Sequence, residues 1–410
     1  MNIFLRKWLG ISFFNFFMVA SLGVLLRYKI AFYLPFFEQK FVLHSHSHFA
    51  FSGWITQTLM LLLVHYLSLK SGDSVFKKYR WLLYANLITA YGMLISFIIQ
   101  GYAFFSIGFS TLSIFVSYYF AVCYWRDLNR ISEKNISQMW LKASLVFSVL
   151  SSIGAFGLAY MMVNKISLEN WYLGAIYFFL HFQYNGWFFF AGMGLLVAKF
   201  EKIDGTVKIL RAAFWLFCLA CIPAYFLSVL WMPLPLVLYF IIIAAVIAQL
   251  AGWILMVKVF FKNKLFISQQ FSKYGKILLL LSAIAFSIKL LLQSGSVHPA
   301  LSQLSYGFRP IIIGYLHLVL LAVTSIFMIG YIVSFEMITI SKRLIMGIFI
   351  FVSGVIINEL LLMLQGVSAL SYNIVPYMNI LLLAAAFILF TGIGLMFISC
   401  FDKKVDVLID

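Results

Sequence analysis

The histidines of this sequence are the side chains best suited to bind a metal ion or haem iron. Three of them form one run, His44-Ser-His46-Ser-His48. On a helix, His44 and His48 share a face because they are four residues apart, whereas His46 points about 200° away. Neutral imidazole is the commonest metal ligand, and it also holds haem iron axially. The alternative interpretation of the run is an interfacial polar stretch that binds nothing.

Two further positions combine a chemical side chain with apolar surroundings. In the run His181-Phe-Gln-Tyr184-Asn185, a helix places His181, Tyr184 and Asn185 on one face, where His181 is either a ligand or a hydrogen-bonded core histidine. Glu359 is the one acid well inside an apolar segment. It is therefore protonated, paired with a cation or part of a proton relay, unless it and Asn358 only join helices. Tyr184 and Glu359 are the candidate catalytic residues.

The composition places these residues in a membrane. Of the 410 residues, 64% are hydrophobic and only 10% are charged, whereas a soluble chain needs about 25% charged residues. The apolar segments do not alternate with polar residues, which excludes a membrane β-barrel. We expect an all-α polytopic membrane protein, a single transmembrane domain over 1–410. Its spans are predicted at 9–34, 42–69, 81–101, 103–125, 139–163, 171–198, 209–230, 234–258, 276–294, 310–335, 344–366 and 375–400.

The basic residues predict the orientation of these about twelve helices. With the spans placed as above, 23 of the 29 Lys and Arg residues fall on the side of the N-terminus. By the positive-inside rule both termini are cytoplasmic, and the net charge of +17 reflects topology and not nucleic-acid binding. Apart from His65, every histidine then lies in the outer half of the membrane or at its outer surface. Arg6 and Lys7 precede a first span that we expect to be retained and not cleaved as a signal.

The cysteines do not indicate a redox or zinc site. Cys218 and Cys221 form a Cys-x-x-Cys pair, but the pair lies inside an apolar helix, where small residues pack between helices. No spacing typical of zinc ligands or of a disulfide framework is present.

These features resemble a known family. A histidine near the outer start of span two, one in span six and one in span ten are similar to the catalytic subunit of haem–copper oxidases and nitric oxide reductases. The run His48-Phe-Ala-Phe-Ser-Gly-Trp54 resembles span two of the cbb3-type members. The chain also resembles NnrS-type membrane proteins, which have an early His-x-His run and contain haem and copper.

The resemblance implies a ligand set. One of His44, His46 and His48 would pair with His317 to hold haem b, and His181 would correspond to the copper ligand of span six. Two departures stand out, since span seven has no histidine and Tyr315 occupies the place of a second histidine in span ten. Either a second metal site is rebuilt from His181, His298 and a spare histidine of the run, or the chain carries one haem.

Basic residues predicted on the outer side complete the candidate set. Arg27 ends the first span and Arg309 opens the tenth, so both are candidates to pair with haem propionates, unless they are only interfacial anchors.

The expected function is a haem b protein, with copper as a second candidate cofactor, in electron transfer or in nitric oxide or oxygen chemistry. It would be an oxidoreductase of the haem–copper type or a haem sensor. The expected setting is a bacterial plasma membrane, with the lipid bilayer, haem and an electron-donor subunit or cytochrome as partners. The alternative is a proton- or metal-coupled transporter whose pathway is formed by the histidines and Glu359. A structural or assembly protein of a respiratory complex is the third hypothesis.

Overall fold

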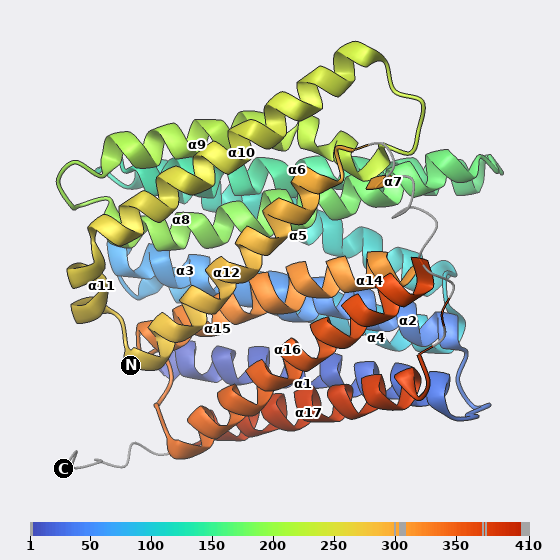
Figure 1. The fold of residues 1–410 in the computed structure, drawn as a ribbon. Coiled ribbons are helices and arrows are strands. Elements are labelled where there is room, and N and C mark those ends of the chain that lie inside the picture. The colour runs from blue at the N-terminus through green and yellow to red at the C-terminus, as the bar shows by residue number, and fades with distance from the viewer. Residues whose placement is uncertain (1–2, 299–300, 303–308, 371–372, 374, 403–410) are drawn as a thin grey trace. The chain divides into compact units, whose positions relative to one another are not determined.

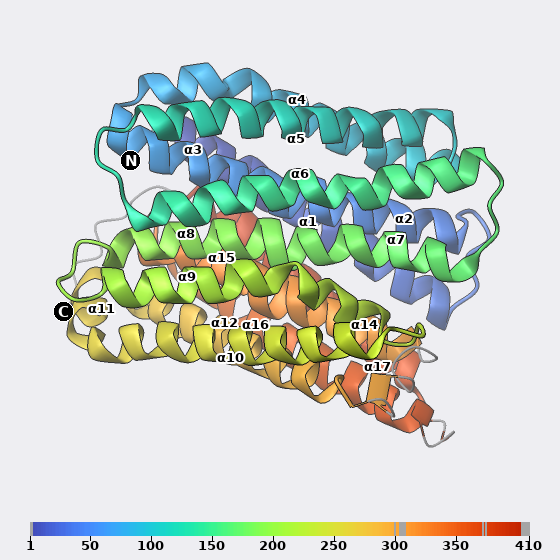
Figure 2. The same ribbon diagram turned by 90° about the horizontal axis from the view of Figure 1, so that it is seen from above.

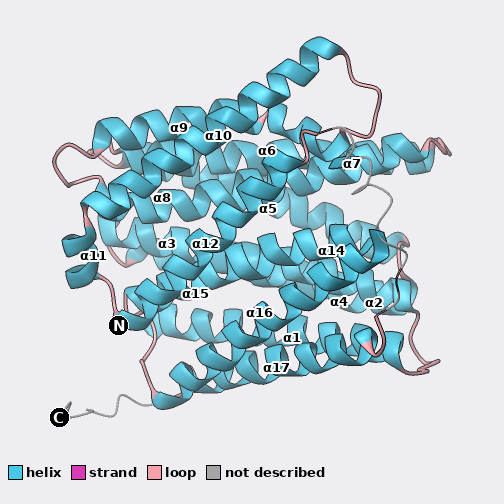
Figure 3. Ribbon diagram, in the orientation of Figure 1, coloured by secondary structure: helices cyan, strands magenta, loops and turns pink. Residues whose placement is uncertain are grey.

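The computed structural model describes the chain except residues 1–2, 299–300, 303–308, 371–372, 374 and 403–410. Within the described residues the protein consists of helices joined by loops, and no strand is present (Figures 1 and 3). The all-helical prediction is therefore confirmed for this part of the chain.

The helices cluster into two compact units whose segments interleave along the sequence. Unit 1 comprises Met1–Val116, Gln270–Leu280 and Ser325–Asp410, and unit 2 comprises Ser117–Gln269 and Leu281–Thr324. The elements lying wholly within unit 1 are α1 (Ile3–Ala31), α2 (Gln39–Phe49), η1 (Ala50–Thr56), α3 (Gln57–Ser71), α4 (Ser74–Gln100), α15 (Ile326–Ser334), α16 (Lys342–Leu370) and α17 (Met378–Ser399).

Unit 2 holds the middle of the chain. Its elements are α6 (Ile136–Val163), α7 (Glu169–His181), η2 (Phe182–Phe188), α8 (Phe189–Phe200), α9 (Val207–Cys221), η3 (Pro223–Val229), α10 (Leu236–Lys262) and α14 (Arg309–His317). The division between the units falls inside α5 (Phe104–Arg130) and α12 (Lys273–Gly295), and at the ends of α11 (Lys264–Gln270) and η4 (Leu318–Ser325).

In unit 1, α1 is the helix around which the others pack. It contacts α17 on one side and α2, η1 and α3 on the other, while α4 covers α2 and α3, and α16 pairs with α17 (Figure 1). Glycines bring α16 and α17 close together, because a Cβ atom on Gly347 would lie 2.9 Å from the carbonyl oxygen of Gly392. Apolar lipid gives helices little reason to associate, so close packing at such small residues must hold the pair together.

In unit 2, α6 has the central place. It packs against α7, η2 and α8 and also contacts α9, which pairs with α10 (Figure 2). Gly186 of η2 lies directly against Phe147 of α6, where an added Cβ would come within 2.5 Å of the Phe147 Cβ.

The described residues contain ten helices long and apolar enough to cross a membrane, and an eleventh if α9 and η3 are one span bent by 46°. Such a chain is a multi-pass membrane protein. The segment predicted as span six, 171–198, is helical as α7, η2 and α8 but is not among these helices. Its polar run around Gln183 and Asn185 lowers the apolar character of the segment.

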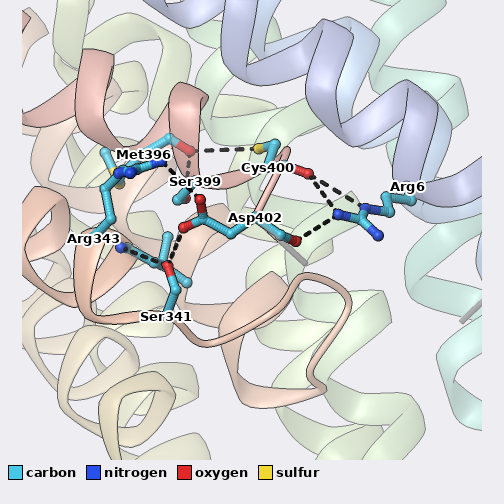
Figure 4. Close-up of polar contacts among 8 residues, drawn as sticks. Arg6, Ser341, Arg343, Met396, Ser399, Cys400 and Asp402 are labelled. Atoms are coloured by element: carbon cyan, nitrogen blue, oxygen red, sulfur yellow. Dashed lines mark hydrogen bonds and ion pairs between the residues drawn. The ribbon is translucent and has the colours of Figure 1, made fainter. Parts of the chain in front are cut away.

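The two ends of unit 1 meet in a polar cluster on one side of the helices (Figure 4). Arg6 of α1 donates hydrogen bonds to the carbonyl oxygens of Cys400, at 3.3 Å, and Asp402, at 2.6 Å. The Asp402 carboxylate accepts a hydrogen bond from Ser341 at 2.6 Å and forms an ion pair with Arg343 at 2.7 Å. The start of α1, the start of α16 and the end of α17 therefore lie together.

Candidate functional site

The histidine run of α2 divides between two neighbouring helices. His48 stacks on Phe97 of α4 with ring centroids 4.3 Å apart, and its Nε2 lies 3.0 Å from the hydroxyl of Tyr102. His44 meets the same tyrosine edge-on, with ring centroids 4.6 Å apart. His46 points instead to α1. The helical spacing correctly predicts that His44 and His48 share a face and that His46 does not.

The geometry of His46 fixes its tautomer. Its Nδ1 lies 3.1 Å from the carbonyl oxygen of Val19 on α1, and its ring packs over Gly23. A carbonyl oxygen can only accept, so Nδ1 carries the proton and, in the neutral imidazole, Nε2 carries the lone pair. Histidines that ligate metals characteristically donate the other ring N–H to a backbone carbonyl in this way.

His317 shows the same arrangement in unit 2. Its Nδ1 lies 2.8 Å from the carbonyl oxygen of Ile313, one turn earlier on α14. The ring is half-buried. As with His46, the hydrogen bond makes Nε2 the nitrogen with the lone pair.

His181 is arranged differently. Its side chain is only 1% exposed, and its Nε2 donates to the carbonyl oxygen of Cys221 at 2.8 Å. Its Nδ1 accepts from the side-chain amide of Asn185 at 3.0 Å, and the Cys221 thiol lies 3.8 Å from the Asn185 carbonyl oxygen. Both ring nitrogens are therefore engaged, and His181 could ligate a metal only by giving up one of these hydrogen bonds.

Each of the three predicted histidine-bearing spans contains a π-helix. The π-helical segments η1, η2 and η4 begin two residues after His48, directly after His181 and directly after His317. π-Helical turns are rare, occur mostly as short insertions in α-helices and are frequent at functional sites. Three predicted spans lie between one such position and the next, so the three π-helices form a regular pattern along the chain.

Two of these positions also share a sequence motif that the sequence analysis missed. Residues 48–54 read His-Phe-Ala-Phe-Ser-Gly-Trp, and residues 181–187 read His-Phe-Gln-Tyr-Asn-Gly-Trp. Histidine, phenylalanine, glycine and tryptophan recur at identical spacing, and both tryptophans are almost fully buried. Comparing the two histidine segments with each other would have revealed this internal repeat.

A buried amide cluster supports the first π-helix. Asn15 of α1 donates to the carbonyl oxygen of Gly53 at 2.6 Å, and Asn86 of α4 donates to the carbonyl oxygen of Ser52 at 3.1 Å. Asn86 also donates to the side-chain oxygen of Gln57 at 2.7 Å. Because a π-helix shifts the backbone hydrogen-bond pattern, its carbonyl groups accept side-chain donors from neighbouring helices. All three amide side chains are completely buried.

The remaining predicted site residues lie in separate places. Tyr184 is buried in η2, where its hydroxyl makes polar contacts with Ser228 and Tyr315 of unit 2. Glu359 is half-buried on α16 of unit 1, and its carboxylate accepts a 3.2 Å hydrogen bond from the adjacent Asn358. The others, half-buried or exposed, are Arg27 on α1, Arg309 at the start of α14 and His298 after α12.

The described side chains do not form a ready metal centre. No three His, Cys, Asp or Glu side chains in this part of the chain are grouped so that they could hold a metal ion. The structure thus does not bring His181 and His298 together with a third ligand of these types.

No protein-family model matches the chain, and no curated protein is detectably similar to it.

Proposed function

We propose that this membrane protein binds haem b and works in electron transfer or in nitric oxide or oxygen chemistry, with His46 in unit 1 and His317 in unit 2 as the histidines best arranged to ligate iron. The proposed topology has twelve spans with both termini in the cytoplasm of a bacterial cell. The choice of His46 from the run of three rests on its hydrogen bond to Val19. The inclusion of His317 rests on the family resemblance, which implies a haem ligand in span ten.

One observation supports this proposal above the others. His46 and His317 both direct Nδ1 to a backbone carbonyl oxygen, at 3.1 and 2.8 Å, and so both have the tautomer that iron ligation requires. In contrast, Nε2 of His48 lies beside the Tyr102 hydroxyl, and both ring nitrogens of His181 are engaged, with Cys221 and Asn185. The residues present therefore fit a histidine-ligated haem, which would supply one-electron transfer when bound.

Copper fits the described residues less well. Copper ligation would need several imidazoles around one point. Both ring nitrogens of His181 are already hydrogen-bonded, and His298 is exposed. We therefore assign copper no step in the proposed function.

The test is the reduced-minus-oxidised visible spectrum of the detergent-purified protein, with a pyridine haemochrome assay on the same sample. We expect a sharp b-type α band and about one haem per chain. His46→Ala and His317→Ala should lose the haem, while His48→Ala, from the same run, and His65→Ala should keep it. All variants should first elute as folded protein on size exclusion.

Two results would contradict the proposal. The first is a folded, colourless wild-type protein produced with haem available. The second is an equal haem content in His46→Ala and His48→Ala, which would remove the axial assignment.

A second candidate function is transport, and a broken helix favours it. The predicted span seven consists of α9 and the 3₁₀ segment η3, bent by 46° next to Pro223. Interrupted helices at membrane depth commonly line the substrate sites of transporters. Uptake of a labelled substrate into vesicles would favour this function, particularly if the protein is colourless.

A further inference from the structure

A lysine buried inside unit 2 lacks a polar partner among the described residues. Lys289 lies on α12, six residues before its end at Gly295, and its side chain is only 3% exposed. The ammonium makes no hydrogen bond and no ion pair with any described side chain or carbonyl. Its closest described aromatic contact is the ring of Phe286, whose centre lies 5.4 Å away. A bare ammonium ion in such surroundings is strongly destabilised.

Unit 2 contains no acidic residue that could neutralise Lys289. Its sequence has five acids, Asp127, Glu133, Glu169, Glu201 and Asp204, and all of them lie at helix ends or in loops. From residue 205 to residue 324 the chain has no Asp or Glu. Unit 2 itself therefore offers no carboxylate to pair with a charged Lys289.

A pair of glutamines provides a second open polar position on the same helix face. Gln293 lies four residues after Lys289 and donates a 2.6 Å hydrogen bond to the side-chain oxygen of Gln249 on α10. The other amide atom of Gln293, Oε1, is buried and has no hydrogen-bond partner within the described part of the chain. Since an amide group occupies the same volume when turned by 180°, this pair can present either an acceptor or a donor.

The bend in the predicted seventh span lies near Lys289. Cys221 is the last residue of α9 before the bend into η3. Lys289 is within electrostatic range of the Cys221 thiol and of the His181 imidazole. The ammonium thus lies in the part of unit 2 where α9 bends into η3, and membrane proteins tolerate polar groups at such interruptions of a helix.

The chemistry of these groups selects the ligand. One ammonium matches one negative charge, and the apolar walls formed by Phe286 and its neighbour Trp253 would leave the second charge of a phosphate unpaired. The two oxygens of a carboxylate can accept one hydrogen bond from an ammonium and one from an amide. We propose that unit 2 contains a binding site for a monocarboxylate, with Lys289 as its charged anchor and Gln293 as its second hydrogen-bonding group. This site is independent of haem.

The experiment measures binding of radiolabelled benzoate, and of acetate in a second series, to the purified full-length protein in chloride buffer of constant ionic strength. Wild type should bind saturably, and Lys289→Arg should retain binding. Lys289→Met should bind about tenfold more weakly or worse, because a charge-assisted hydrogen bond is lost. Lys165→Met, at an exposed loop position of the same unit, is the matched control and should bind as wild type does.

Thermal unfolding gives a readout that does not depend on the ligand. Without carboxylate, Lys289→Met should melt at or above the wild-type temperature, because an uncompensated buried charge has been removed. Benzoate should raise the melting temperature of wild type but not of Lys289→Met. If Lys289→Met does not fold, Gln293→Leu replaces it and should weaken binding several-fold.

Two results would overturn the site. One is the absence of saturable binding of both carboxylates to wild type. The other is equal binding by wild type and by a folded Lys289→Met or Gln293→Leu protein. A colourless protein that binds benzoate would keep this site and remove the haem proposal, and a red protein that does not bind it would do the reverse.

Discussion

The side-chain amide of Asn15 donates a 2.6 Å hydrogen bond to the carbonyl oxygen of Gly53, inside the first π-helix. The oxygen of the same amide accepts a 2.9 Å hydrogen bond from Tyr91. One fully buried side chain of α1 thus joins η1 to α4. The π-helix that follows the histidine run is fixed by its neighbours and not by its own backbone alone.

Replacing Asn15 by alanine should therefore destabilise unit 1. The change removes the partner of the buried Gly53 carbonyl oxygen and of the half-buried Tyr91 hydroxyl, and leaving a buried polar group unpaired costs about 1–3 kcal/mol. The variant should show a lower melting temperature in detergent. Asn164→Ala is the control, because Asn164 is exposed and bonds only within its own turn. Equal melting temperatures for the two variants would show that the buried cluster does not support the fold.

Gly186 and Gly157 should respond in opposite ways to alanine. A Cβ at Gly186 would come within 2.5 Å of Phe147, whereas Gly157 of α6 has nothing within 4 Å. Gly186→Ala should destabilise the protein by about 1–3 kcal/mol through overpacking. Gly157→Ala should leave stability unchanged or raise it by about 0.4–1 kcal/mol, because alanine favours the helix. Thermal unfolding of both variants checks the prediction, and a stable Gly186→Ala protein would contradict the close approach of η2 to α6.

His181 should act mainly in stability. His181→Ala removes the donor to the Cys221 carbonyl oxygen and the acceptor of Asn185, in a site that is almost fully buried. We expect a loss of about 2–4 kcal/mol in unfolding free energy with an unchanged haem content. Copper analysis of the wild type and this variant tests the sequence-based prediction that His181 is a copper ligand. Copper bound to the wild type and lost from His181→Ala would support that prediction against a purely structural role.

Cys400 should resist alkylation in the native protein. It lies just after α17, and its side chain is only 6% exposed. The thiolate is the reactive form, and burial both disfavours it and keeps the reagent out. Iodoacetamide should label Cys400 after denaturation but not before, as seen by peptide mass spectrometry. Rapid labelling of Cys400 in the folded protein would refute its burial.

Much of the architecture follows from the sequence, because lipid imposes strong rules on apolar chains. Each of the twelve predicted segments is helical in the structure. This includes 171–198, whose polar run lowers its mean hydropathy, so that it is not among the helices apolar enough to cross a membrane. The placement of His46 opposite to His44 and His48 follows from the helical repeat alone. The π-helical segments η1, η2 and η4 could not be predicted from the hydrophobic periodicity of the sequence, because they change the backbone hydrogen bonds only locally.

The sequence by itself determined the membrane class, the helices and the positions of the histidines along them, because hydrophobicity and helical spacing are properties of the local chain. Only the tertiary structure decided which groups satisfy one another. In the structure, Nδ1 of His46 donates to the Val19 carbonyl oxygen, and both ring nitrogens of His181 are hydrogen-bonded, to Cys221 and Asn185. Lys289 has no acidic residue near it in its unit. The carbonyl groups of Val19 and Cys221 lie on helices distant in sequence from the histidines that they contact, and hydrogen bonding across buried helix contacts is set by packing and not by composition.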